Sequence, residues 1–425
     1  MNALEVRGLK VRFGADIVVN DLSLDVAPGE CVAIIGESGA GKSLTARALL
    51  GLGPAGATVT TDRMSVGGAD VHGLSERGWR RLRGARIALV SQDALVSLDP
   101  LRRVEAEIAE PLRVHPHVLS VSRPSRREAA RRVQALLRRV WMPDPERRAR
   151  QYPHELSGGL RQRALIASAI AASPVVLVAD EPTTALDATV QARILDLLRE
   201  IADAGTAVVF VSHDFAAVRR VADRVLVMQD GMVVESGSVA DVIGNPQHEH
   251  TRRLVAATAH EPRRVDDAAA EPVLQVVAAS KAFGAFPAVA DASFAVREGR
   301  TLGIVGESGS GKTTLARMLV GVETPDAGEL RWFGRHRVQL VHQNPLGAFD
   351  PRWTIARSLR EALAAGGVSR ADRAARSEAL LVEVGLDPAL AGRRPGELSG
   401  GQRQRAALAR ARPAGPAVRG GGEAG

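Results

Sequence analysis

Short apolar runs recur along the chain and are separated by polar or glycine-rich segments. The clearest of them lie at residues 31–35, 175–179, 208–211 and 301–305. Runs of four or five apolar residues are typical of strands buried on both faces of a parallel sheet. The pattern predicts an α/β protein whose buried strands lead directly into polar residues that can carry chemistry.

Helical spacing appears between these runs. Val133, Leu136, Leu137 and Val140 form an apolar stripe, and the Ser-Arg-Arg-Glu segment at 125–128 resembles a capping box. The longest apolar stretch, residues 164–179, contains two serines and is broken by a proline. It is too interrupted to span a bilayer, so it predicts a buried helix followed by a strand.

Two glycine-rich loops follow apolar runs and share the pattern Gly-x-x-x-x-Gly-Lys-Ser/Thr. In such loops backbone N–H groups surround phosphate oxygens, the lysine reaches the β- and γ-phosphates, and the hydroxyl binds Mg²⁺. The N-terminus of the next helix adds its dipole. An ordinary glycine-rich turn is the alternative, but two full matches in this context argue against it. The predicted phosphate-binding residues are Gly36, Glu37, Ser38, Gly39, Ala40, Gly41, Lys42 and Ser43 in the first loop and Gly306, Glu307, Ser308, Gly309, Ser310, Gly311, Lys312 and Thr313 in the second.

Two further strands of the first half lead into ionisable residues. The run at 175–179 is followed by Asp180 and Glu181, and the run at 208–211 by Ser212 and His213. Apolar residues that end in two acids indicate a buried strand that delivers carboxylates to a bound nucleotide. The alternatives are a solvated acidic turn and a structural histidine.

The chain contains an internal repeat that extends beyond the loops. Phe13 and Phe283 each precede their loop lysine by 29 residues, and Gln92 and Gln343 each follow their loop. The motif Leu-Ser-Gly-Gly then occurs twice, at 156–159 and 398–401. A repeat of this length indicates two whole domains in tandem. The order of these motifs resembles that of ATP-binding-cassette (ABC) ATPases over nearly the whole chain.

The resemblance implies a fold and a role for each matched residue. The fold is a tandem of α/β P-loop domains, each with a RecA-like parallel sheet, an antiparallel β subdomain and a helical subdomain. ATP and Mg²⁺ would bind between the loop of one half and the Leu-Ser-Gly-Gly motif of the other. The resemblance implies that Phe13 and Phe283 stack on adenine, and that Glu181 polarises the attacking water, with Gln92 and His213 also catalytic. The implied metal-binding residues are Ser43, Gln92, Asp180, Thr313 and Gln343. The implied ATP contacts of the two Leu-Ser-Gly-Gly motifs are Ser157, Gly158, Gly159, Ser399, Gly400 and Gly401.

The second half departs from this pattern after its Leu-Ser-Gly-Gly motif. The step from Ser157 to Asp180 is 23 residues, and the same step from Ser399 reaches Gly422 instead of an aspartate. Because the segment beyond Arg412 is rich in proline and glycine, we expect no core strand there. Residues 1–258 therefore predict a complete nucleotide-binding domain, 259–272 a linker, and 273–425 an incomplete second copy without catalytic acids.

Composition and charge limit the class of protein. A single cysteine, Cys31, excludes a disulfide framework and cysteine-based metal centres. No targeting or spanning segment is visible, so transport would need separate membrane subunits. The net charge of +8 is densest at residues 123–150. We interpret these arginines first as a solvated helix face. Contact with anionic lipid or a membrane subunit ranks second, and nucleic-acid binding third, because aromatic residues are sparse.

One further segment narrows the family. Residues 246–254 resemble the Pro-x-His-Pro-Tyr-Thr-x-x-Leu tail of dipeptide and oligopeptide importers, including glutathione and nickel relatives, with Glu249 and His250 in place of Pro-Tyr. The resemblance implies an ATP-hydrolysing subunit that energises import of peptides or related solutes. Its partners would be two membrane permease subunits and an extracytoplasmic solute-binding protein. The chain would lie peripherally on the cytoplasmic side of the membrane, binding no nucleic acid and no small-molecule substrate besides ATP.

Two other classes stay open at this point. A soluble double ABC protein acting on ribosomes or damaged DNA would usually carry a long charged linker or cysteine-rich zinc inserts, and this chain has neither. A non-functional or regulatory remnant of an importer subunit is the other, because the strands missing from the second half belong to the centre of a parallel sheet.

Overall fold

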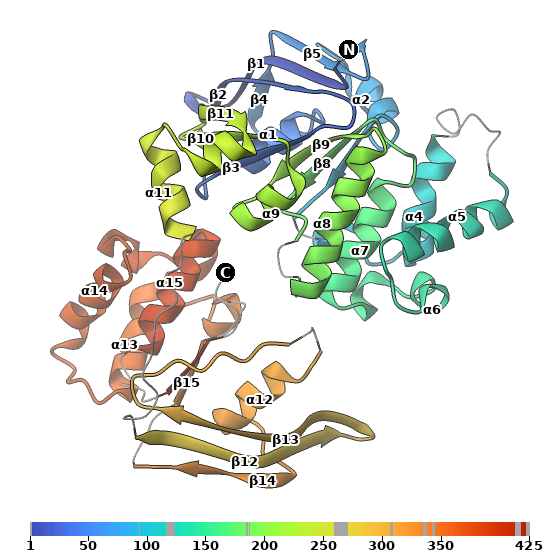
Figure 1. Cartoon of the computed structure of the whole chain (residues 1–425). Helices are drawn as coiled ribbons and strands as arrows, with labels where there is room; N and C mark the ends of the chain where they lie inside the picture. Colours follow the sequence, from blue (N-terminus) through green and yellow to red (C-terminus); the bar gives the residue numbers. More distant parts are fainter. Residues whose placement is uncertain are drawn as a thin grey trace. The chain divides into compact units, whose positions relative to one another are not determined.

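The computed structural model describes residues 2–92, 94–115, 124–183, 186, 188–258, 271–306, 309–334, 338–341, 345–412 and 418–421. The chain divides into two compact units, Met1–Pro262 and Arg263–Gly425 (Figure 1). The predicted linker at 259–272 lies almost wholly outside the described residues, and strand β12 already begins at its last position, Pro272.

The first unit begins with an antiparallel sheet of order β2-β1-β5-β6, in which β4 also pairs with β1. Alternate residues of β1 and β2 are buried because one face of this sheet packs on the core. Its strands are β1 (Leu4–Phe13), β2 (Asp16–Val26), β4 (Ala57–Thr60), β5 (Arg63–Val66) and β6 (Ala69–Asp70).

The second sheet of this unit positions the predicted site. Its order is β11-β10-β3-β9-β8-β7, and all its pairings are parallel except that of β11 with β10. Every residue of β3, β8 and β9 is buried, as their apolar runs predict. The strands are β3 (Cys31–Gly36), β7 (Ile87–Val90), β8 (Val176–Asp180), β9 (Ala207–Val211), β10 (Arg224–Gln229) and β11 (Met232–Ser238).

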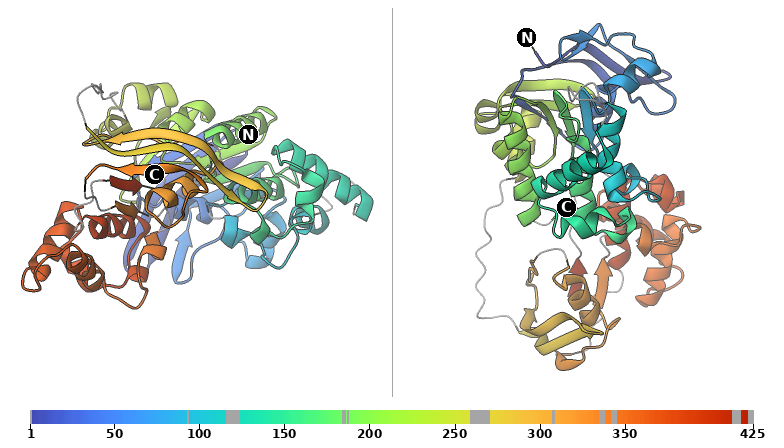
Figure 2. Two further views of the ribbon diagram at one scale, coloured as in Figure 1. Left: turned by 90° about the horizontal axis from the view of Figure 1, so that it is seen from below. Right: turned by 90° about the vertical axis from the view of Figure 1, so that its right-hand side faces the viewer.

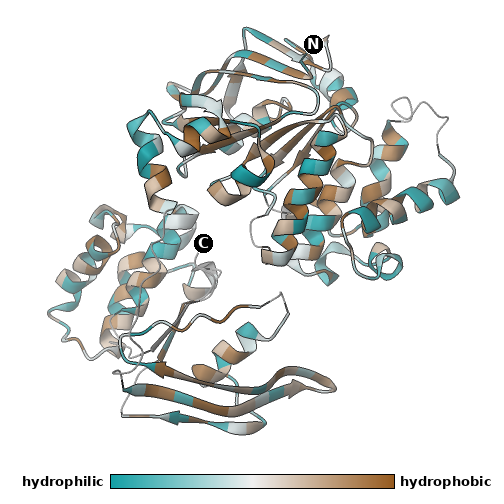
Figure 3. Cartoon of the chain, in the orientation of Figure 1, coloured by the Kyte–Doolittle hydropathy of each residue, from teal (hydrophilic) through white to brown (hydrophobic). Residues whose placement is uncertain are grey.

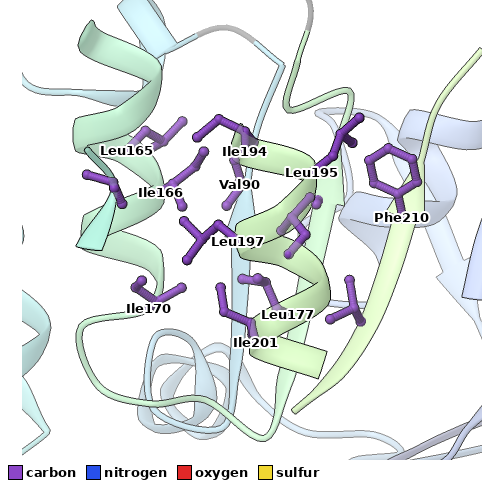
Figure 4. Packing of buried hydrophobic residues seen from close by; sticks show 14 of the residues in the cluster. Val90, Leu165, Ile166, Ile170, Leu177, Ile194, Leu195, Leu197, Ile201 and Phe210 are labelled. Atoms are coloured by element: carbon purple, nitrogen blue, oxygen red, sulfur yellow. The ribbon is translucent and has the colours of Figure 1, made fainter. Parts of the chain in front are cut away.

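Helices cover this sheet and close a continuous apolar core. Figure 4 shows α8 packed beside α7, with Leu197 and Ile166 near Val90 and Leu177 of the strands. The helices are α1 (Lys42–Ala48), α2 (Glu76–Leu82), α3 (Ala94–Ser97), α4 (Val104–Val114), α5 (Arg126–Arg139), α6 (Pro145–Ala149), α7 (Gly158–Ala169), α8 (Ala188–Asp203), α9 (Phe215–Val221), α10 (Val239–Gly244) and α11 (Glu249–Thr258), with the short 3₁₀ turn η2 (Pro153–Glu155). No helix in the described ranges is long and apolar enough to cross a membrane.

Helix α5 forms as its sequence pattern predicts. The Ser125 hydroxyl accepts a hydrogen bond from the backbone N–H of Glu128 at 3.2 Å, which caps the helix. Val133 and Leu137 are fully enclosed by the core, so the arginines of the helix face outward.

The second unit repeats the first in reduced form. A three-stranded antiparallel sheet of order β13-β12-β14 has helix α12 packed on one face (Figures 1 and 2). Helices α13 to α15 share a separate apolar core around Ile355, Leu359 and Leu380. The elements are β12 (Pro272–Phe283), β13 (Phe286–Arg297), α12 (Lys312–Leu319), β14 (Ala327–Trp332), β15 (Val338–Val341), η3 (Pro345–Ala348), α13 (Ile355–Ala365), α14 (Arg373–Glu383), η4 (Pro388–Gly392), η5 (Pro395–Glu397), α15 (Gly400–Ala411) and β16 (Val418–Gly421).

A short strand forms beyond Arg412, where we expected no core strand, and it belongs to a two-stranded sheet. Residues Val418–Gly421 form β16, which pairs in parallel with β15. Val338 lies opposite Val418, as Ile87 lies opposite Val176 in the first unit. Strand pairing needs only backbone N–H and C=O groups, so even a Val-Arg-Gly-Gly segment can occupy the edge of β15. In this register Gly421 corresponds to Ala179, so the next residue in the sequence, Gly422, is the sequence counterpart of Asp180.

The structure also corrects the expectation of a strand before the second loop. Residues 301–306 pair with no strand in the described part of the second unit, although their counterpart β3 lies between β9 and β10. Leu302, Ile304 and Val305 are consequently 43%, 40% and 93% exposed. Both neighbours of β3 come after the Leu-Ser-Gly-Gly motif in the chain, so residues 301–306 depend on segments that have no counterpart among the described residues.

Limited proteolysis should cut the second unit first. Thermolysin cleaves before apolar residues, and Leu302, Ile304 and Val305 lie in backbone without strand pairing, which opens locally at little cost. The first unit should persist as a band ending near Thr258. We also expect residues 273–425 alone to aggregate and residues 1–258 alone to stay in solution and bind ATP. Equal protease resistance of both units would show that another contact protects residues 301–306.

Candidate functional site

The first phosphate-binding loop connects the end of β3 to the start of α1. Gly41 has a φ of +95° and directly precedes the first helical residue, Lys42, in a conformation that residues with a Cβ rarely adopt. At Gly36, a Cβ would lie 2.3 Å from the carbonyl oxygen of Met228 on β10. The loop can therefore turn tightly into α1 only with glycine at both positions, and Ser38, Gly39 and Ala40 lie between them.

The lysine of this loop is folded back into it. The Lys42 side chain is buried, and its Nζ donates hydrogen bonds to the carbonyl oxygens of Gly36 at 2.7 Å and Glu37 at 2.8 Å. Burial lowers the pKa of Lys42, and the nearby Glu181 and Asp180 carboxylates oppose that shift. A buried ammonium that donates to carbonyl oxygens favours an incoming anion such as a nucleotide phosphate.

A hydroxyl and a carboxylate lie together beside the loop. The Oγ of Ser43 donates a hydrogen bond to Oδ1 of Asp180 at 3.0 Å. Asp180 ends the buried strand β8 and is 2% exposed. Burial raises the pKa of Asp180, the hydrogen bond from Ser43 opposes this, and the neighbouring Glu181 raises it further.

These oxygens fit Mg²⁺. Within the described ranges no group of three or more His, Cys, Asp and Glu side chains could hold a metal by itself. Mg²⁺ commonly takes only one or two protein carboxylates and completes its shell with water and substrate phosphates. A serine hydroxyl and one aspartate next to a phosphate-binding loop match that donor set.

Glu181 is held between two side chains from neighbouring strands. Nε2 of Gln92 donates to its Oε2 at 2.8 Å, and Nδ1 of His213 lies 3.1 Å from its Oε1. Gln92, Glu181 and His213 follow β7, β8 and β9, whose carboxyl ends lie at one edge of the parallel sheet. The structure thus brings together the three predicted catalytic residues, next to Ser43 and Lys42.

The backbone around Glu181 and His213 is fixed by local bonds. Glu181 has a φ of +46°, and its N–H donates to the carbonyl oxygen of Val211 at 3.0 Å. Asp214 caps α9 by accepting from the N–H groups of Ala216 and Ala217. A glutamate in the left-handed region costs about 1–3 kcal/mol, so the surrounding strands must stabilise this conformation.

The second phosphate-binding loop has the same turn but different surroundings. Gly311 has a φ of +91° before α12, and Nζ of Lys312 donates to the carbonyl oxygen of Gly306 at 2.7 Å. Gly309 also has positive φ, and Thr313 is exposed. Glu307, Ser308 and Gln343, which we predicted to bind nucleotide or metal here, lie outside the described residues.

Both Leu-Ser-Gly-Gly motifs begin a helix. Ser157 is the N-cap of α7 and Ser399 the N-cap of α15, and Ser399 accepts a hydrogen bond from the backbone N–H of Gln402 at 3.3 Å. The two motifs offer exposed backbone at a positive helix end, which suits an anion. The motif residues are Ser157, Gly158 and Gly159 in the first unit and Ser399, Gly400 and Gly401 in the second. Their contact with the loop of the other unit stays a prediction.

The two predicted adenine-stacking residues lie at hairpin ends. Phe13 ends β1 and is half-buried, and it pairs with Asp16 across the turn. Phe283 ends β12 and is exposed, with Nζ of Lys281 5.9 Å from the centre of its ring. An aromatic ring at such a tip can stack on a base, and this role also stays a prediction.

The segment after the second sheet contacts the first phosphate-binding loop, which its sequence did not predict. His250, on α11, is 2% exposed, and its Nδ1 lies 3.9 Å from Oε1 of Glu37 in the first loop. Neither ring nitrogen of His250 has a hydrogen-bond partner among the described residues. The only sequence signal for this contact was that position 250 is His where the importer tail has Tyr.

The site and the fold agree with a family model. The model described as "ABC transporter" matches residues 19–184 and 289–418. The chain therefore belongs to the ABC transporter family, and it is an ABC-type ATPase that binds ATP.

Relatives are similar over nearly the whole chain. The "Peptidoglycan transport ATP-binding protein YejF" of Agrobacterium fabrum strain C58 is 40% identical over 445 residues, covering 96% of this chain and 80% of the relative. The "Glutathione import ATP-binding protein GsiA" of Salmonella choleraesuis strain SC-B67 is 38% identical over 480 residues, covering 98% of this chain and 76% of the relative. The protein of the same name from Escherichia coli K12 is 38% identical over 485 residues, with the same coverage.

Replacing Glu181 with Gln should separate binding from hydrolysis. The amide keeps the shape but cannot act as a base, so turnover should fall roughly 10²–10⁴-fold, the usual contribution of a positioned base. ATP binding, measured by equilibrium dialysis, should persist. Glu200→Gln, an exposed position on α8, is the matched control. If the turnover of Glu181→Gln stayed within about threefold of the wild-type value, the loss would be far smaller than this range. That result would exclude Glu181 as the base that polarises the attacking water.

The hydrogen bond from His213 should be visible as a shifted titration. Hydrogen bonding to Glu181 raises the pKa of His213, so the Glu181→Gln variant should show a lower pKa for this imidazole by ¹H–¹³C NMR. Because the folded pKa is raised, the stabilisation is present below the ordinary histidine pKa and is lost as pH rises through the folded value. His213→Gln assigns the signal, and an unchanged pKa in Glu181→Gln would contradict the contact.

Proposed function

We propose that the chain is the ATP-hydrolysing subunit of an importer for peptides or related small solutes. The observation that carries the ATPase role is the Glu181 carboxylate held between Gln92 and His213 beside the Ser43–Asp180 pair. The cargo class is supported by the names of the relatives, which refer to peptidoglycan transport and glutathione import. The altered importer tail at 246–254 supports the same class.

The residues of the first site divide the work of hydrolysis. Lys42 would leave its carbonyl partners and donate to the β- and γ-phosphates, while the loop N–H groups enclose their oxygens. Ser43, Asp180 and Gln92 would hold Mg²⁺, which neutralises phosphate charge when bound. Glu181 would orient and polarise the attacking water. Since Nδ1 of His213 faces Glu181, Nε2 is the nitrogen that can donate to the γ-phosphate.

Two composite sites follow from the tandem arrangement of the family. The first would join Lys42, Asp180 and Glu181 to residues 399–401 of the second unit. The second would join Lys312, Thr313 and Gln343 to residues 157–159 of the first unit. In the register set by β15 and β16, the position of the aspartate in this second site is Gly422. We therefore propose that the second site contributes to nucleotide-driven closure more than to hydrolysis.

The proposed partners follow from the transport role. Two membrane permease subunits would form the pathway, and an extracytoplasmic binding protein would select the solute. The chain would bind the permeases from the cytoplasmic side of the membrane as a peripheral subunit. ATP-driven closure and reopening of the two units would then reset the permeases.

Two lysine variants test this function. In a deletion strain, the wild-type chain should restore uptake of labelled tripeptide or glutathione, and Lys42→Ala should not, because Lys42 belongs to the only site with acids among the described residues. Lys312→Ala should retain substantial ATP turnover and reduced uptake. Normal uptake of both solutes without the chain would exclude this cargo class while leaving the ATPase role intact. An equal loss of turnover in Lys42→Ala and Lys312→Ala would contradict the proposal that the second site contributes to closure more than to hydrolysis.

A further inference from the structure

The outer face of α5 carries arginines that the nucleotide site does not use. Arg127, Arg131 and Arg138 are exposed, and spacings of four and seven residues place them on one side of the helix. The buried residues of α5 lie on the opposite side. We refer to these three residues as the α5 arginine row. Figure 3 shows the largely hydrophilic colouring of this helix.

The two charges at the start of this row, Arg127 and Arg131, oppose the stability of their own helix, whereas Arg138 lies in the last turn, which favours a cation, and pairs with Glu146. Arg126 and Arg127 occupy the first turn, where the positive end of the helix dipole disfavours cations. Arg127 and Arg131 are four residues apart, a spacing at which like charges repel. Neutral helix-forming residues at positions 127 and 131 would stabilise α5 better, so the stability of this helix does not explain the charges of Arg127 and Arg131.

The surroundings of the row are strongly basic. Residues 126–150 contain nine arginines and three acidic residues. Two of the acids already pair within the unit, Glu128 with Arg132 and Glu146 with Arg138. The patch therefore has a large excess of positive charge that attracts an anionic partner.

The chemistry of the patch favours a lipid surface over a protein. None of the exposed large apolar side chains of the described chain lies at residues 126–150. Protein interfaces usually have an apolar or aromatic core, and the patch offers none. It also lacks an exposed aromatic platform for the bases of single-stranded nucleic acid. Binding to anionic headgroups requires neither an apolar core nor an aromatic platform, because each basic residue near a charged bilayer adds to the attraction by the surface potential.

We propose that the α5 arginine row binds the anionic phosphate headgroups of the membrane, as a contact separate from the permease subunits. No helix in the described part of the subunit is long and apolar enough to span a membrane. The arginine row attracts the subunit to the bilayer through a contact that involves neither ATP nor solute. The row lies outside the nucleotide site, so this contact can form in any state of the hydrolysis cycle.

Vesicle co-sedimentation of the full chain tests the proposal. The probes are phosphatidylcholine vesicles with and without phosphatidylglycerol. Wild type should bind only the anionic vesicles, and added salt should weaken binding. The triple variant Arg127→Gln, Arg131→Gln, Arg138→Gln should bind about 100-fold more weakly, from roughly fivefold per arginine near the surface. Its ATP turnover and circular dichroism should match wild type.

A charge-matched control distinguishes the row from net charge. Arg77→Gln, Arg81→Gln and Arg219→Gln together remove the same charge from exposed positions on α2 and α9, and this variant should keep most of its vesicle binding. Equal weakening of the two triple variants, or unchanged binding of the row variant, would overturn the proposal.

Two competitors identify the source of the anion. Glycerol phosphate should displace the chain from vesicles no better than chloride at equal ionic strength, because the three arginines are exposed on a helix face. Preferential displacement by glycerol phosphate would indicate a site for a free phosphate and overturn the lipid assignment. Tighter binding of wild type to duplex DNA than to anionic vesicles, lost in the row variant, would assign the row to nucleic acid and overturn it as well.

Discussion

The structure depends on the pairing of β3 with β9 and β10. β3 carries the first phosphate-binding loop, and both of its neighbours are encoded roughly 170–200 residues later in the chain. With both neighbours present, every residue of β3 is buried and Gly36 lies against the backbone of β10. Without them, the equivalent residues 301–306 pair with no strand in the described chain, and their apolar side chains are exposed. The loop sequence alone therefore produces the turn, as the second loop shows, whereas burial of the strand before the loop requires non-local strand pairing.

The same sheet sets the electrostatics of the site. Parallel strands deliver Gln92, Glu181 and His213 to one edge, where burial disfavours charge on both Lys42 and Asp180. The pKa of the lysine is lowered and that of the aspartate raised, so each gains from a bound partner of opposite charge. A nucleotide phosphate would satisfy the lysine, and a divalent cation the aspartate. Binding of the metal–nucleotide complex would therefore relieve the unfavourable burial of both charges, and this gain would add to the binding free energy.

Much of the first unit could be predicted because its chemistry is local. The loops, the strand before Asp180 and the stripe of α5 each follow from spacing within a few residues. β16 could not be predicted, because its Arg and Gly residues carry no apolar signal and only the edge of β15 favours a strand there. The unpaired state of residues 301–306 was missed for the converse reason, since their apolar run predicts a strand whose partners are non-local. His250 and Glu37 meet only through the tertiary fold.

β16 separates two requirements that usually coincide in a catalytic strand. Its backbone pairs with β15 in the register that β8 keeps with β7, so one of the two strand pairings of the acid-bearing strand is reproduced. Backbone pairing does not depend on the side chains, whereas catalysis requires a carboxylate directly after the strand, and in the sequence the residue that follows Gly421 is glycine. A parallel strand can therefore pair with its neighbour whether or not a catalytic residue follows it. For this reason, we infer the capacity of each unit for hydrolysis from the residues that end its strands and not from the presence of the strands.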